Sequence, residues 1–167
     1  MDYIAEYKRK LVPVDKAVKV VKSGDLVHYG EFMMNSSYLD DALAKRVDEL
    51  ENVNIRTTTC PFPPSTILAD PERKHFIYND NHMSAASRKL HDQNMCNYIP
   101  LTYHEGPSFY ERGYVEADVA MVKVAPMDKH GFFNFGTSLS LTPNNCDTAK
   151  TVIVEVNTSV PVCLGGC

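Results

Sequence analysis

The sequence predicts an α/β domain with an open, mostly parallel sheet and flanking helices. Short strand-like segments alternate with helical patterns along the chain, which is typical of βαβ units. Residues 118–125 form a nearly uninterrupted apolar run, as expected of a strand buried on both faces of a parallel sheet. A length of 167 residues is that of a single domain with a sizeable core.

The first part of the chain predicts a helix, a strand and a second helix. Residues 14–23 carry apolar side chains at helical spacing, and Gly24 is suited to end this helix in a left-handed conformation. A short strand is expected at residues 26–29. The second helix begins at Ser37, where Ser37 and Asp40 resemble a capping box.

The remainder of the chain predicts further strands and two short helices. The strands are expected at residues 53–59, 75–78, 97–102 and 151–157, which are rich in β-branched and aromatic side chains. Ser84 can cap a helix that continues to about Gln93. Another short helix is expected over residues 107–112, ending at Gly113.

A hairpin is expected near residues 126–136, directly after the apolar strand. Pro126 interrupts the strand, and Gly131 closes a turn in which it can take a positive φ. Phenylalanines and Asn134 follow. Aromatic rings beside an amide suit the wall of a small-molecule cleft, but a hairpin that inserts its rings into the core is supported equally well. Both interpretations stay open at this point.

The composition is that of a soluble globular protein, with 44% hydrophobic and 23% charged residues. Lys and Arg number 17 against 21 Asp and Glu, and this net charge of −4 argues against a nucleic-acid partner. The basic cluster at residues 8–10 is expected to be a solvated flank.

Neither a membrane partner nor secretion is expected. No apolar stretch approaches the roughly 20 residues that span a bilayer, and residues 1–6 lack the apolar core of a signal peptide. The cysteines are odd in number and scattered, at Cys60, Cys96, Cys146, Cys163 and Cys167. Reduced thiols in a cytoplasmic protein are therefore expected.

The residues that follow the predicted strands indicate where a ligand could bind. In an open parallel sheet, ligands bind beyond the carboxyl ends of the strands. That edge is rich in polar and aromatic side chains, whereas the opposite edge carries plain connections. The residues expected to line a substrate pocket are Gly30, Glu31, Phe32, Asn35, His82, Tyr103, His104, Asn134 and Phe135.

Each of these side chains has a structural interpretation as well. His104 and Glu105 could form an acid–base pair, but a surface role is favoured because neighbours in sequence point in different directions. Glu31 is the carboxylate of most interest, although an exposed loop position is the better single expectation. Cys60 could be a nucleophile, yet a buried hydrophobic role is more common.

The sequence carries no standard cofactor or metal motif. His75, His82 and His91 lack the i, i+4 spacing of a helical zinc site, and neither HExxH nor a cysteine pair accompanies them. GxGxxG and GxxxxGK[ST] are also missing. No metal and no bound cofactor are expected.

Several blocks of the sequence together resemble the acetyl-CoA hydrolase/transferase family. They are residues 21–25 with 28–32, 83–91, 97–101, 103–105 with 110–114, and 122–128 with 130–136. The last block is specific, and the others support it in combination. Within the family, the blocks look closest to the butyryl-CoA:acetate and 4-hydroxybutyrate CoA-transferases of anaerobic bacteria.

This resemblance implies a CoA-transferase of two similar α/β halves that face each other across the active site. Residues 1–160 would form the N-terminal half, and residues 161–167 would begin a linker to a C-terminal half. A glutamate of the C-terminal half would attack the acyl-CoA thioester and carry CoA as a glutamyl thioester, a form of covalent catalysis. None of Glu31, Glu105 and Glu155 matches that motif, so no catalytic residue is expected in this chain.

The resemblance also implies the partners and leaves alternatives. Acyl-CoA, with CoA as a substrate, a short-chain carboxylate such as acetate, the C-terminal half and further copies of the enzyme are the expected partners. The pocket residues named above would form the second wall of the acyl site. The alternatives are a non-catalytic domain that binds acyl-CoA or a carboxylate, and an acyl-CoA thioester hydrolase.

Overall fold

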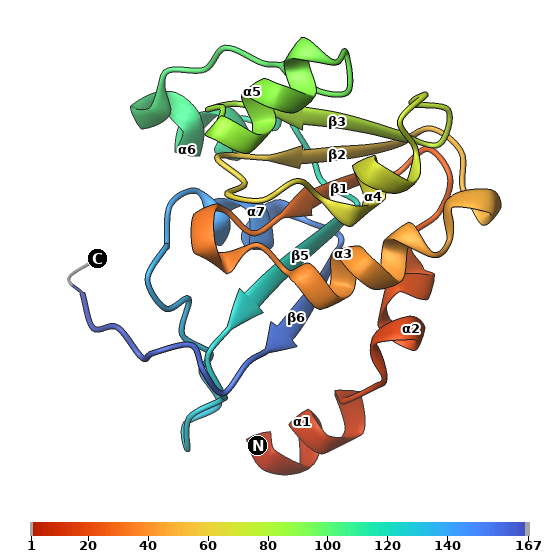
Figure 1. Ribbon diagram of the computed structural model, residues 1–167. Coiled ribbons are helices and arrows are strands. Elements are labelled where there is room, and N and C mark those ends of the chain that lie inside the picture. The colour runs from red at the N-terminus through yellow and green to blue at the C-terminus, as the bar shows by residue number, and fades with distance from the viewer. Residues whose placement is uncertain (1, 166–167) are drawn as a thin grey trace.

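The computed structural model describes residues 2–165, and within them the chain forms a six-stranded, fully parallel sheet (Figure 1). The strands are β1 (Leu26–Tyr29), β2 (Val53–Thr57), β3 (Phe76–Asp80), β4 (Asn97–Tyr98), β5 (Val119–Val124) and β6 (Thr151–Val156). Their order is β4-β3-β2-β1-β5-β6. The predicted open parallel sheet is thus confirmed. Strands β2, β3 and β4 are added on one side of β1, and β5 and β6 on its other side, so the switch point of the sheet lies between β1 and β5.

Helices cover both faces of this sheet. They are α1 (Tyr3–Lys10), α2 (Val14–Ala17), α3 (Ser37–Ala44), α4 (Ser65–Ala69), α5 (Ala85–Asp92), α6 (Gly106–Glu111) and α7 (Thr142–Thr148), with 3-10 turns at Val18–Val20, Phe32–Met34, Val47–Glu49 and Tyr103–Glu105. In Figure 1, α3 and α4 lie in front of the sheet and α7 lies behind it.

The main hydrophobic core lies between the sheet and the α3–α5 layer. Alternate residues of the central strands, such as Tyr29, Ile55 and Met121, are fully buried there. Leu43 of α3 and Leu90 of α5 close the same cluster from the helix side. Burial of these large apolar side chains is the main favourable contribution to this side of the fold.

The opposite face of the sheet combines a smaller apolar cluster around Tyr110 and Leu141 with buried polar side chains, and hydrogen bonds help to anchor its helices. The fully buried His28 places Nε2 2.8 Å from the Tyr110 hydroxyl of α6 and Nδ1 3.0 Å from Asn145 Nδ2 of α7. Burial lowers the pKa of His28 to about 3, so the ring is neutral at pH 7. Beside it, the Arg56 guanidinium lies 5.6 Å from the centre of the Phe109 ring.

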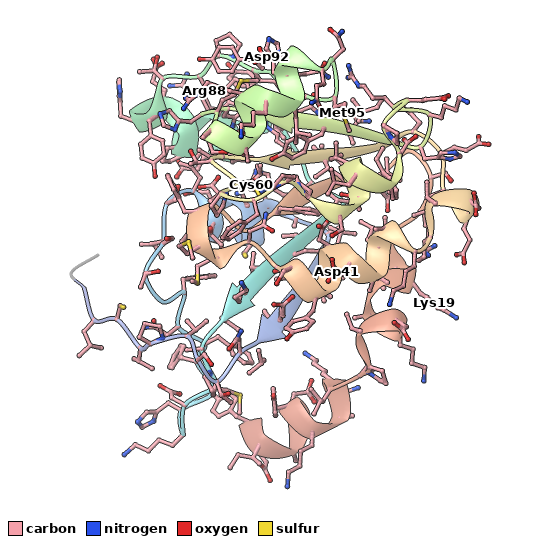
Figure 2. All side chains as sticks on the ribbon, viewed as in Figure 1. Lys19, Asp41, Cys60, Arg88, Asp92 and Met95 are labelled. Atoms are coloured by element: carbon pink, nitrogen blue, oxygen red, sulfur yellow. The ribbon has the colours of Figure 1, made fainter. Side chains whose placement is uncertain are left out.

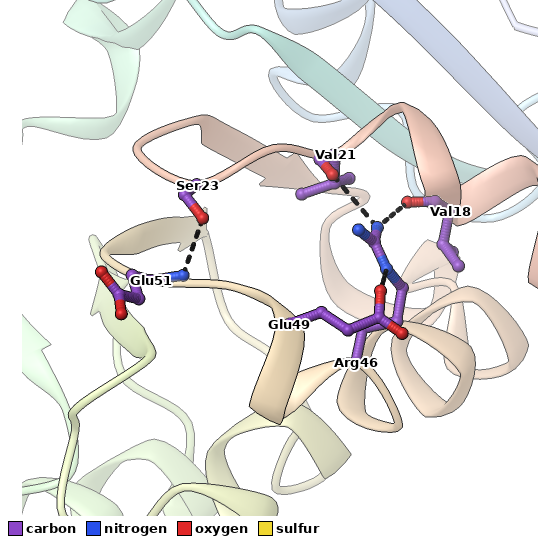
Figure 3. A network of polar contacts seen from close by, with 6 residues as sticks. All are labelled: Val18, Val21, Ser23, Arg46, Glu49 and Glu51. Atoms are coloured by element: carbon purple, nitrogen blue, oxygen red, sulfur yellow. Dashed lines mark hydrogen bonds and ion pairs between the residues drawn. The ribbon is translucent and has the colours of Figure 1, made fainter.

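The amino edge of the sheet is closed by local contacts (Figure 3). Arg46 donates to the carbonyl oxygens of Val18 and Val21 at 2.5 and 3.1 Å and also pairs with Glu49. These contacts satisfy backbone carbonyls where the turn Val18–Val20 ends. The edge opposite the expected ligand site is therefore occupied by structural connections.

Several predicted elements are confirmed with small changes of length. β1 has the predicted bounds, and Ser84 caps α5 by accepting from the Ser87 amide. The predicted helix over 107–112 is α6, and Gly113 follows it with a φ of 71°. β4 is shorter than the predicted 97–102 strand, since Pro100 lacks the N–H needed to continue the ladder.

One predicted helix has the wrong bounds, and three helices were not predicted. The helix expected over 14–23 ends as α2 at Ala17 and becomes a 3-10 turn, so Gly24, with a φ of 84°, lies in the turn before β1 and does not end a helix. α1, α4 and α7 were not predicted, because they are short and α7 carries almost no apolar side chains.

The segment 126–136 doubles back as expected, but neither arm is a β-strand. The amide of Asp128 bonds to the Phe132 carbonyl. Phe132 is 72% exposed, so the rings are not all inserted into the core. Phe133 packs against Tyr7 of α1 with ring centres 6.0 Å apart, while Gly131 has a φ of 90° and no room for a Cβ beside the Tyr3 ring. The turn is thus held by the N-terminal helix.

Glu155 of β6 caps α3, and the predicted capping box of Ser37 and Asp40 is wrong. Ser37 is the first helical residue, and the N-cap residue Ser36 makes no side-chain capping bond. Instead Glu155 Oε2 accepts from the amides of Tyr38 and Leu39 at 2.9 and 3.1 Å. A carboxylate at this position satisfies free N–H groups and is attracted to the helix N-terminus.

We expect Glu155→Ala to lower the free energy of unfolding by about 1–2 kcal/mol, because it removes this cap. Glu155→Gln keeps an oxygen acceptor and should lose less. Urea denaturation followed by circular dichroism measures both values. Equal stability of E155A and the wild type would contradict a capping role for Glu155.

Candidate functional site

The loops that follow the strands are linked to one another along the carboxyl edge of the sheet. The Phe32 amide, after β1, bonds to the Thr58 carbonyl after β2 at 3.4 Å. Thr59 in turn donates its amide to Asp80 at the end of β3 at 3.0 Å. The hydroxyls of Tyr103, after β4, and Ser140, after β5, are 2.6 Å apart. The strand-end residues therefore gather at one border of the molecule.

The tight turn after β1 depends on Gly30. Its amide bonds to the Met121 carbonyl at 2.7 Å, and a Cβ at this position would lie 2.2 Å from the Met34 carbonyl oxygen. Only glycine fits such a close approach of two backbone segments. The turn brings Phe32, which has a φ of 51°, and Asn35 over the edge between β1 and β5.

A cleft of about 260 Å³ opens at this place. Its apolar lining consists of Phe32, Met33, Pro61, Phe62, Pro63 and Pro64, and its polar lining of Asn35, Ser37, Asp40, Asp41, Cys60, Ser65 and Lys123. Figure 2 labels Asp41 on α3 and Cys60 in the loop after β2. The cleft lies at the switch point of the sheet, where open α/β proteins bind their ligands.

Two of the acidic groups in the cleft are already bound within the chain. Asp40 accepts from the Tyr29 hydroxyl at 2.9 Å, from the Thr66 hydroxyl at 2.7 Å and from the Ser65 amide at 2.5 Å. Burial raises the pKa of Asp40, and these donors offset part of the rise. Asp41 accepts from the Ser65 hydroxyl at 2.5 Å. Both carboxylates thus fix α4 against α3.

Cys60 is a buried thiol. Its Sγ donates to the Phe62 carbonyl at 2.9 Å, and burial raises the pKa of the thiol to about 11. The thiolate is therefore scarce at neutral pH, which favours the hydrophobic interpretation over a nucleophile. Cys60, Cys96, Cys146 and Cys163 are all free, and Cys167 lies outside the described residues.

A second, open hollow of about 320 Å³ lies beside the first one. Phe32 and Tyr103 line it together with residues 137–140. Glu31 lies beneath and accepts from the Leu141 amide at 3.0 Å. Glu31 is completely buried, so the expectation of an exposed loop carboxylate was wrong. Its position makes it a support of the 137–141 segment.

The other predicted pocket residues lie along the same edge but outside both linings. His82 is exposed, with Nδ1 2.7 Å from the Thr59 hydroxyl. His104 and Glu105 are exposed in the 3-10 turn before α6. The Asn134 amide group bonds to the backbone N–H and carbonyl of Cys163, at 3.1 and 2.9 Å, and Phe135 is half-buried. Asn134 thus fixes the segment after β6.

The histidines considered for a metal site lie apart from one another. Nδ1 of His75 contacts the Leu50 carbonyl, and Nδ1 of His91 contacts the Cys96 carbonyl. Residues 2–165 contain no cluster of three or more His, Cys, Asp or Glu that could hold a metal ion. No helix in this part of the chain is long and apolar enough to cross a bilayer.

Sequence reasoning missed the charged members of the cleft, above all Lys123. This residue interrupts the apolar run of β5, at the second-last position of the strand, and is only half-buried. A single charge inside an otherwise buried strand near its carboxyl end was the signal that could have identified it. Asp40 and Asp41 lie on α3, away from the strand ends, so the strand-end rule does not select them.

Comparisons with known proteins identify relatives of this chain. The family model described as the acetyl-CoA hydrolase/transferase N-terminal domain matches residues 1–167. The butyryl-CoA:acetate CoA-transferase of Anaerostipes caccae is 47% identical over 99% of this chain and 37% of its own length. The probable butyrate:acetyl-CoA coenzyme A-transferase of Syntrophomonas wolfei is 44% identical over 98% of this chain and 36% of its own length.

A solved structure is similar as well. The crystal structure of RipA from Yersinia pestis superposes with a TM-score of 0.86 at 25% identity, over 99% of this chain and 40% of that chain. The chain therefore spans little more than a third of the length of the two curated relatives, at 37% and 36%.

The buried position of Glu31 predicts a distinct pH dependence of stability. Burial raises the pKa of Glu31 above its ordinary value. The stability contributed by Glu31 is therefore fully present below its unfolded pKa and is lost as the pH rises through the folded pKa. Glu31→Gln keeps an oxygen for the Leu141 amide and cannot ionise. Relative to the wild type, E31Q should gain stability as the pH rises from about 4 through the folded pKa of Glu31.

Urea denaturation at several pH values measures this difference. Glu105→Gln, which removes an exposed carboxylate, is the matched control and should show a flat difference. A stability of E31Q that stays constant or falls relative to the wild type over this range would contradict the buried-carboxylate interpretation.

Proposed function

Because this chain belongs to the acetyl-CoA hydrolase/transferase family, we propose that it is one wall of a CoA-transferase active site. The reaction is the transfer of CoA between a short-chain acyl-CoA, of the butyryl or 4-hydroxybutyryl type, and acetate. The observation that carries this proposal is the cleft at the switch point of the sheet, with apolar rings and one free ammonium group. The activities for which the two relatives are named support the choice of substrates, since both relatives match nearly the whole chain.

The nucleophile of the proposed reaction comes from a second domain. Two glutamates near the edge of the sheet already hold backbone groups: Glu31 binds Leu141, and Glu155 caps α3. A glutamate of the second domain attacks the thioester carbonyl, which gives an acyl-glutamyl anhydride and the CoA thiolate. The thiolate then attacks the glutamyl carbonyl, which gives the glutamyl thioester of CoA and releases the acyl carboxylate. Acetate repeats the two steps in reverse and leaves as acetyl-CoA.

This chain contributes the surroundings of the acyl group. The rings of Phe32 and Phe62 and the Met33 side chain form an apolar wall that suits a short alkyl chain and excludes water. Exclusion of water favours transfer to a carboxylate over hydrolysis of the anhydride or the thioester. The hydrogen bonds between the loops hold this wall in place before the substrate arrives.

The arrangement of the whole protein is part of the proposal. Residues 1–160 form the N-terminal domain, and the segment from residue 161 leads toward the second domain. Exposed apolar side chains near the carboxyl edge, including Met33 at 55% and Phe62 at 67%, support a covering partner. We place the enzyme in the cytoplasm as a homo-oligomer, consistent with its free cysteines.

The activity test compares the 167-residue chain with a protein that also contains the second domain. We expect the short chain to show no exchange of CoA between butyryl-CoA and acetate, and the two-domain protein to form acetyl-CoA. Product analysis with and without acetate separates transfer from hydrolysis, which needs no acceptor. Robust exchange by the short chain would contradict a nucleophile in the second domain, and acetate-independent release of CoA would identify a hydrolase.

A further inference from the structure

We propose that Lys123 binds the carboxylate of a small monocarboxylic acid whose apolar tail lies in the cleft between the ends of β1 and β5. This inference rests on the proposed function and deepens it, because it identifies the group that holds the free acid before and after CoA transfer. A four-carbon or two-carbon carboxylate is the ligand class that fits.

The position of Lys123 on the sheet places a charge where an apolar residue would be expected. The other five residues of β5 are buried, and all of them are apolar. Strand alternation puts Lys123 on the same face as Met121, which faces the α3 layer. Lys123 is half-buried and lines the cleft, so its ammonium group is available to a ligand there.

No described side chain forms an ion pair with Lys123. Lys123 makes neither a hydrogen bond nor an ion pair with any of residues 2–165, whereas the other cleft charges are engaged. Glu155 is its neighbour in the β5–β6 register, and the Lys123 charge offsets part of the rise that burial causes in the pKa of Glu155. One oxygen of Glu155 caps α3, however, and Lys123 forms no ion pair with it. Asp41 is committed to the Ser65 hydroxyl. Lys123 is thus the charged group of the cleft to which a bound anion would supply a directly contacting partner of opposite charge.

The remaining lining and the size of the cleft select the ligand. Phe32 and Phe62 offer apolar surface to a short alkyl chain, and Asn35 has an amide nitrogen without a partner among residues 2–165. The volume of about 260 Å³ is smaller than the roughly 300–1,000 Å³ of pockets that enclose drug-sized molecules. A short acid therefore fits inside, and the nucleotide part of CoA lies elsewhere.

Asp41 provides a second test of the proposal, because removal of its charge should change anion binding in the direction opposite to removal of the Lys123 charge. Its carboxylate lines the same cleft and repels a bound anion, so removal of its charge should strengthen binding. A ligand that carried a positive charge would respond in the reverse way to changes at Lys123 and Asp41. The pair of variants therefore reports the charge of the occupant.

The test is calorimetric titration of the 167-residue chain with butyrate and with uncharged butyramide, in low salt and without CoA. We expect Lys123→Met to weaken butyrate binding about tenfold or more, the loss of one charge-assisted contact. Lys123→Arg should stay close to the wild type, and Asp41→Asn should bind butyrate more tightly. Lys129→Met removes an exposed lysine from the 126–136 turn and should change nothing. Butyramide should bind the wild type and K123M equally.

Other results would overturn the proposal. They are equal butyrate affinity of K123M and the wild type, no saturable butyrate binding by the wild type, or weaker binding by D41N. If K123M does not fold, NMR of the Lys123 side chain in the wild type decides, because butyrate should shift its Cε resonance and an unchanged resonance would reject the contact.

The test also distinguishes this proposal from the proposed function. Butyrate binding through Lys123 in a two-domain protein without CoA exchange would reject the transferase and keep the site. Normal exchange together with full butyrate binding by K123M would keep the transferase and reject the site.

Discussion

Carboxylate side chains that accept hydrogen bonds from backbone N–H groups hold the functional edge of this protein together. Asp80 binds the amides of Thr59 and His82, both at 3.0 Å, and so joins the loops after β2 and β3. Glu31 and Asp40 hold the Leu141 segment and the start of α4 in the same way. Each such group is buried, and burial raises the pKa of Glu31, Asp40, Asp80 and Glu155 alike. Desolvation of these acids is the cost of fixing these loops through hydrogen bonds to their backbone.

The 126–136 turn shows how this edge is connected to both ends of the chain. Phe133 packs on Tyr7 of α1, so the N-terminal helix supports the turn from one side. Asn134 binds the backbone of Cys163, so the segment after β6 is attached on the other side. The side chains of this turn thus hold three segments together, namely α1, the turn itself and the segment after β6.

Local patterns were sufficient to predict the sheet and insufficient for its long-range contacts. The apolar run of β5 and the Ser84 cap of α5 are readable because their causes lie within a few residues. The cap of α3 is not, since Glu155 lies 117 positions after Tyr38 and only folding brings them together. The strand-end rule likewise selected Phe32 and Asn35, which line the cleft. It could not tell which side chains enter the cleft, because Asn134 lies at the same edge and binds backbone.

Mapping of the bound ligand onto the sheet is the decisive experiment for this account. Amide resonances of the isotope-labelled chain are followed by NMR during titration with butyryl-CoA. The account predicts that the shifts concentrate in the turn after β1, the loop after β2 and the end of β5, around Phe32, Cys60 and Lys123. Shifts concentrated at the amino edge instead, around Ser23, Arg46 and Glu51, would contradict a ligand site at the carboxyl ends of the strands.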